Sequence, residues 1–340
     1  MLILNIFGKI EPICLSKKLK LYIANIPNDA DNNWNDVFVR EMKASLQHNV
    51  IEYKKLSIES KYNVLDNLKK KFPEQKSSFK SDQEKYFQEI ADNAIYLYFD
   101  YSYEDMPLGG WDENPFDGRF CEEDYSEKII DFINYVGNDI CPELGEAHIN
   151  WIYSSNHNEE INRRIFFSGP KLENGINVLK KWGELFDNFL NSKEDYLQLD
   201  YLFNSLHKDN EYNEYHYFKS YSLCQMLLEN TRETELDWKL PEFINDDSFT
   251  TEQKEKITPV LRQIRNKIGH GDFSGLDVKL EFFAKEVMDG KFLFDYSEYS
   301  RRNWILSFVC GVIDECVREI VFTLFTNRDK LIELKKKNKK

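Results

Sequence analysis

The strongest constraint on the fold of this chain is the spacing of apolar residues in its second half, where they recur every three or four positions. That spacing places them on one face of an α-helix. Five such stripes follow the Gly169-Pro170 dipeptide: Ile176 to Phe189, Tyr196 to Leu206, Tyr212 to Asn230, Val260 to Ile268 and Tyr299 to Phe325. Because each helix must bury one face against another, the pattern predicts an all-α helical bundle over residues 173–330.

One of these helices carries clear signals at both ends. Thr258 is a good N-cap residue and Pro259 is tolerated at the first helical position, so the pair predicts a helix start. Gly269 is expected to end the helix, because glycine is common just past a helix C-terminus. A glycine there is also expected to turn the backbone so that the next side chain points out of the bundle.

The first half has a different pattern, in which strand-like and helix-like segments alternate. Expected strands are 94–101, 147–153 and 164–167, and expected helices lie within 34–46, 86–90 and 129–136. The sequence therefore predicts an α+β domain over residues 1–172 before the bundle. The Lys-rich segment 331–340 is expected to be a solvated basic tail.

Composition excludes several classes of protein. The net charge of −14 argues against general coating of nucleic acid, which relies on surplus cations, and most of the acidic excess lies before residue 190. No apolar run is long enough to cross a bilayer, and the start lacks the features of a secretory signal. Six dispersed cysteines without a C-x-x-C pair predict neither a zinc site nor a disulfide framework. We expect a cytoplasmic protein without a metal or cofactor.

The residues from Arg262 to Asp272 form the segment best suited to chemistry. Metal-free RNA cleavage needs a base near the 2′-hydroxyl, an acid near the leaving 5′-oxygen and a cation that stabilises charge on the phosphate. A histidine such as His270 exchanges protons near neutral pH, and the guanidinium of Arg265 offers a rigid fork of donors to phosphate. Asn266 lies four residues before His270, so a continued helix would place both on one face and let Asn266 orient the ribose or phosphate.

The same residues carry a resemblance to a known family. Arg265, followed directly by Asn266 and separated by four residues from His270, resembles the R-x(4–6)-H signature of the HEPN superfamily. Its members are all-helical domains that frequently act as RNases in bacterial defence and toxin systems. The segment 269–272, Gly-His-Gly-Asp, is similar to the abortive-infection branch of that superfamily.

This resemblance covers residues 175–330 and implies a function. It implies a metal-independent endoribonuclease that leaves a 2′,3′-cyclic phosphate and a 5′-hydroxyl, with Arg265, His270 and Asn266 as catalytic residues. It also implies a homodimer through the bundle, in which two motifs face each other across a two-fold axis. RNA is the expected substrate, with tRNA as one candidate, and the cations expected to guide it are Lys267, Arg262, Arg301 and Arg302.

Three alternatives remain open at this level. Arg265 and His270 could simply neutralise the C-terminal dipole of their helix. The bundle could be a non-catalytic module that binds a nucleotide or a protein. The nuclease could instead be the toxin of a pair and need a separate antitoxin. In the leading interpretation, the domain at 1–172 senses a trigger, such as a phage protein, or restrains the nuclease.

Overall fold

The chain forms two compact units, Met1–Asn204 and Ser205–Lys340. The computed structural model describes residues 2–25, 93–99, 125–137, 149, 151–154, 172–206, 211–229, 233–244, 249–288, 290 and 298–337. The expected strand at 164–167 and the expected helices within 34–46 and 86–90 lie outside these ranges. Among the helices that the structure does describe, none combines the length and apolarity that a bilayer crossing demands.

The described part of the first unit contains an antiparallel sheet in the order β2-β3-β4-β1-β5. Its strands are β1 (Leu2–Phe7), β2 (Ile13–Ser16), β3 (Leu21–Asn25), β4 (Ala94–Phe99) and β5 (Trp151–Ser154). Alternate side chains of β1, namely Leu2, Leu4 and Ile6, are buried, as expected for a strand with one face on a core. The strand expected at 94–101 is observed as β4, and the one expected at 147–153 is observed only from Trp151 onward, as β5.

Three helices accompany this sheet: α4 (Tyr125–Val136), α5 (Leu172–Phe189) and α6 (Lys193–Ser205). Their shared core is aromatic. The ring of Phe132 lies 5.2 Å from that of Trp182 and 5.1 Å from that of Phe203, and Phe186 lies 5.6 Å from Phe203. These rings meet edge to face, a favoured geometry for aromatic pairs, and they join all three helices.

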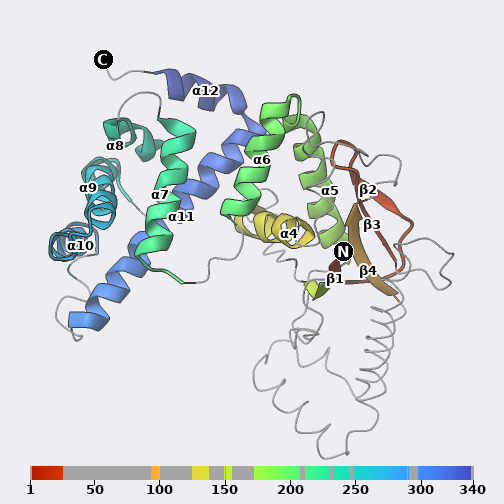
Figure 1. Cartoon of the computed structure of the whole chain (residues 1–340), viewed down its shortest axis with the longest axis horizontal. Helices are drawn as coiled ribbons and strands as arrows, with labels where there is room; N and C mark the ends of the chain where they lie inside the picture. The colour runs from red at the N-terminus through yellow and green to blue at the C-terminus, as the bar shows by residue number, and fades with distance from the viewer. Residues whose placement is uncertain are drawn as a thin grey trace, which may run out of the picture. The chain divides into compact units, whose positions relative to one another are not determined.

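Helix α5 also packs closely on strand β2 (Figure 1). A Cβ atom at Gly183 would collide with the backbone carbonyl of Leu15, so only glycine allows this approach. The Asp187 carboxylate accepts bonds from the Ser16 hydroxyl at 2.6 Å and from the N–H groups of Lys17 and Lys18 at 3.0 Å. The chain divides at 204/205, at the last residue of α6, whereas the change of periodicity placed the boundary at 172/173.

The described part of the second unit is helical. Its elements are α7 (Glu214–Leu228), the 3-10 turn η6 (Glu233–Glu235), α8 (Leu236–Lys239), the 3-10 turn η7 (Leu240–Phe243), α9 (Thr251–Gly269), α10 (Phe273–Val287), α11 (Glu298–Thr326) and α12 (Arg328–Lys336). Helix α7 lies against α11, and α9 lies against α10 (Figure 1). The expected α+β region followed by helices is thus observed.

The predicted start of helix α9 at Thr258 was wrong. The helix begins at Thr251 and is capped by Thr250, whose hydroxyl accepts from the Gln253 N–H while the Gln253 side chain accepts from the Thr250 N–H. This reciprocal cap satisfies two backbone donors, so it outweighs the proline signal. Pro259 lies inside the helix, and the Thr258 hydroxyl donates to the Asp237 carbonyl at 2.7 Å instead of capping.

The expected basic tail begins inside the packed helix α12, where Leu331 and Leu334 are buried. The fully buried Lys239 ammonium holds this helix: it donates to the Leu228 carbonyl at 2.8 Å, to Glu235 at 2.7 Å and to the Lys335 carbonyl at 3.0 Å. All three donors of the ammonium are satisfied, which makes its burial tolerable.

Candidate functional site

The site predicted from the sequence lies where α9 ends and α10 begins. His270 is the C-cap residue of α9, and its N–H donates to the Asn266 carbonyl at 3.0 Å. The next two N–H groups close a Schellman turn, from Gly271 to Ile268 at 3.0 Å and from Asp272 to Lys267 at 2.9 Å. The His270 side chain is exposed at this corner.

The glycine that turns the backbone is Gly271, with φ +66°, and not Gly269 as expected. Gly269 keeps helical geometry as the last residue of α9. Its lack of a side chain leaves room for a neighbouring residue. A Cβ atom there would come within 3.2 Å of the Phe218 ring on α7. The structure thus corrects the role of Gly269: it lets an aromatic ring approach the helix end.

An ion pair fixes the corner between the two helices. The Lys267 ammonium lies 2.5 Å from the Asp272 carboxylate, which also caps α10 by accepting from the Gly275 N–H at 2.9 Å. The hydrogen bond from Lys267, followed by the one from Gly275, lowers the pKa of the Asp272 carboxyl. A side chain at Gly275 would collide with both charged groups. Lys267 therefore pairs with the residue that caps α10.

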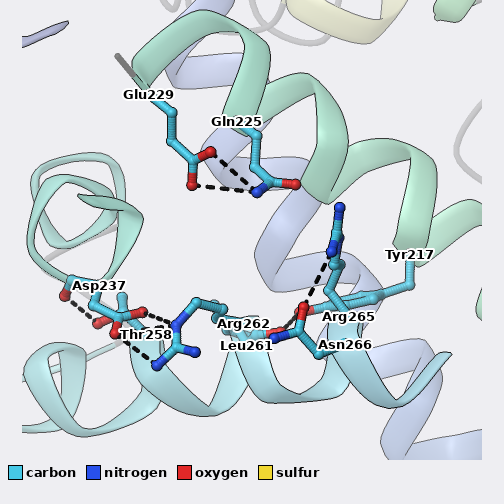
Figure 2. A network of polar contacts seen from close by, with 9 residues as sticks. All are labelled: Tyr217, Gln225, Glu229, Asp237, Thr258, Leu261, Arg262, Arg265 and Asn266. Atoms are coloured by element: carbon cyan, nitrogen blue, oxygen red, sulfur yellow. Dashed lines mark hydrogen bonds and ion pairs between the residues drawn. The ribbon is translucent and has the colours of Figure 1, made fainter. Parts of the chain in front are cut away.

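Arg265 is held on α9 by an aromatic ring and an amide. Its guanidinium carbon lies 5.1 Å from the centre of the Phe218 ring, and Nη1 donates to the Asn266 side-chain oxygen at 3.1 Å (Figure 2). The Nε atom is buried and has no hydrogen-bond partner in the part of the chain that the structure describes. Tyr217, next to Phe218, donates to the Leu261 carbonyl at 2.8 Å and fixes α7 on α9.

The cations expected to guide RNA have different surroundings. Figure 2 shows Arg262 pointing to Asp237 on α8, where Nε and Nη2 both donate to the carboxylate at 3.0 Å. Arg302 pairs with Glu214 at 2.8 Å and Asp277 at 3.2 Å. Within the described ranges, Arg265 and Arg301 form no ion pair.

The spacing analysis did not predict a buried polar cluster between α7 and α11. His216 Nε2 lies 2.9 Å from both oxygens of Asp314, and the Ser220 hydroxyl donates to the same carboxylate at 2.9 Å. Each of the three residues is at most 4% exposed. Burial, and next the charge of Asp314, raises the pKa of the nearby Tyr212 phenol. Asp314 is far from His216 in sequence, so no local signal could have paired them.

Chemically, the corner at the end of α9 offers a guanidinium held in place, an amide beside it and an exposed imidazole. The guanidinium can donate to an anion, the amide can donate or accept, and the imidazole can transfer a proton. In the described ranges, no three His, Cys, Asp or Glu side chains are grouped so that they could bind a metal ion.

Comparison with known proteins adds no assignment to this geometry. No family model, no curated protein and no solved structure matches the chain.

Proposed function

We propose that the second unit is a HEPN-type endoribonuclease that cleaves RNA without a metal ion. One observation carries the proposal: Arg265, stacked on Phe218 and bonded to Asn266, has no acidic partner among the described residues and lies five positions before the exposed His270. A guanidinium whose charge is not neutralised by a carboxylate is available to a phosphate.

Each motif residue has a distinct role in this reaction. The 2′-oxygen attacks phosphorus and loses its proton, the 5′-oxygen leaves and gains one, and the product keeps a 2′,3′-cyclic phosphate. His270 transfers a proton, and Arg265 stabilises the negative charge that accumulates on the phosphate oxygens. Asn266 orients the Arg265 guanidinium through the hydrogen bond between their side chains.

A homodimer would complete the site. One imidazole cannot easily remove one proton and deliver another in the same turnover, whereas two facing motifs supply two imidazoles. Helix α11 exposes Trp304 (53%) and Phe308 (42%), which are apolar side chains of the kind that subunit interfaces cover. The first unit would then sense a trigger, such as a phage protein, or restrain the nuclease. That role rests on the family resemblance and the order of the two units.

The test is cleavage of RNA by the full chain in EDTA, with analysis of the new 3′ ends. Wild type should produce cyclic-phosphate ends, and His270→Ala should abolish them without lowering the melting temperature, because the imidazole is exposed. Arg265→Lys keeps the charge but loses the rigid fork, so activity should fall strongly. Lys256→Ala, which removes an exposed cation from the same helix, is the matched control and should cleave like wild type.

Two results would contradict the proposal. If wild type leaves RNA intact with every trigger tried while binding nucleotides or a protein, the unit is a non-catalytic module. If His270→Ala cleaves like wild type, the observed activity belongs to another site or a contaminant.

A further inference from the structure

An exposed aromatic ring lies beside the candidate catalytic residues. Phe273 is the first residue of α10, three positions after His270, and it is 54% exposed. Between the two residues, a Cβ atom at Gly271 would meet no other atom within 4 Å. The surface from His270 to Phe273 is therefore open around the turn.

The Phe273 ring has a fixed neighbour. The Arg302 guanidinium carbon lies 5.7 Å from the ring centre, and the guanidinium is itself held by Glu214 at 2.8 Å and Asp277 at 3.2 Å. A cation held over an aromatic ring favours one ring orientation. Phe273 is thus partly ordered before any ligand binds, which lowers the entropy cost of stacking a second flat group on it.

The charges around the turn argue against recognition mainly through the RNA backbone. Lys267 pairs with Asp272, the residue before Phe273, and Arg302, which lies over the Phe273 ring, pairs with Glu214. A cation already paired with a carboxylate releases few counterions when it meets a phosphate, so it adds little affinity. Among the described residues, the exposed ring of Phe273 is a further group beside His270 that can contact an RNA base.

The proposed reaction itself requires an unstacked nucleotide. The 2′-oxygen must approach phosphorus in line with the departing 5′-oxygen, and the regular A-form duplex holds these atoms out of line. A nucleotide that turns into the reactive geometry leaves its stack, and aromatic side chains are the usual partners of such bases. An exposed ring next to the proton-transferring histidine fits this requirement.

We propose that Phe273 stacks on an unpaired base next to the scissile phosphate, so that the site selects single-stranded RNA. This inference rests on the proposed nuclease function, but stacking can be measured without cleavage. The probe is a 2′-O-methyl dodecamer with one 2-aminopurine, which cannot be cleaved and whose fluorescence falls on stacking. The same dodecamer in a duplex is the comparison.

The full chain should bind the single strand more tightly than the duplex and quench its fluorescence. Phe273→Ala should weaken binding by roughly 5- to 100-fold and remove the quench. Phe273→Leu should do the same while keeping the melting temperature, because it retains apolar volume but no π-face. Phe273→Trp should preserve both signals. Phe282→Ala is the matched control, since Phe282 is another exposed phenylalanine of α10 (45%).

The outcomes separate the two proposals. Equal binding of single strand and duplex, no binding, or a quench unchanged in both Phe273→Ala and Phe273→Leu would overturn the stacking role, even if the enzyme cleaves RNA. A quench that depends on Phe273, together with intact unmodified RNA under every condition, would support stacking and overturn the nuclease.

Discussion

Removing one partner of the buried cluster between α7 and α11 should strongly destabilise the second unit. His216 supplies a contact to each oxygen of Asp314, and Ser220 adds a third to the same carboxylate. In His216→Ala, the carboxylate would stay buried without the two contacts that the imidazole makes to its oxygens. Breaking a buried pair in this way costs about 3 to 5 kcal/mol.

This loss can be measured by urea denaturation followed by circular dichroism. With an m-value of about 2 kcal/mol per molar urea, a loss of about 4 kcal/mol lowers the midpoint by about 2 M. Asp314→Asn keeps the shape and most hydrogen-bonding capacity, so it should cost less, about 1 kcal/mol. The double variant His216→Ala with Asp314→Ala should cost less than the sum of the single changes. Each single change leaves one buried partner without the other, whereas the double variant removes both.

An exposed ion pair on α9 provides the control. Glu252 and Lys256 lie 2.9 Å apart with side chains 80% and 55% exposed, so Glu252→Ala should not shift the midpoint measurably. If His216→Ala and Glu252→Ala shift the midpoint equally, the argument from burial is refuted.

Three further predictions concern single residues elsewhere in the chain. Gly271→Ala should lower stability by about 1 kcal/mol, because alanine disfavours the left-handed backbone even with open space around it; an unchanged melting temperature would contradict this. Arg262→Ala should lower the melting temperature but leave the rate of RNA cleavage unchanged, since Arg262 is engaged by Asp237; a fall in rate alone would restore a role in RNA binding. Burial raises the pKa of the Cys224 thiol well above its usual range, so at pH 8 iodoacetamide should label the exposed Cys14 and spare Cys224 until urea unfolds the chain, as mass spectrometry of peptides can show.

Local patterns predicted most of the described helices and the place of the motif. The apolar stripes from Ile176 to Phe189 and from Tyr299 to Phe325 correspond to α5 and α11, because helical periodicity depends only on neighbouring residues. The predicted helix start at Thr258 was wrong because one helix contains two start signals. The helix begins after Thr250, which forms the reciprocal cap, and Pro259 lies inside it. The unit boundary also differed, because the collision that makes Gly183 necessary involves a strand far away in sequence.

The sequence by itself determined that Arg265, Asn266 and His270 occupy the end of one helix, since their spacing is local. Only the tertiary structure determined which arginine side chains are paired with carboxylates. Asp237 pairs with Arg262 and Glu214 pairs with Arg302 across separate helices, whereas Arg265 meets the ring of Phe218. Partners from remote segments meet only when the helices pack, so the charge available at the site is a property of the fold and not of the motif.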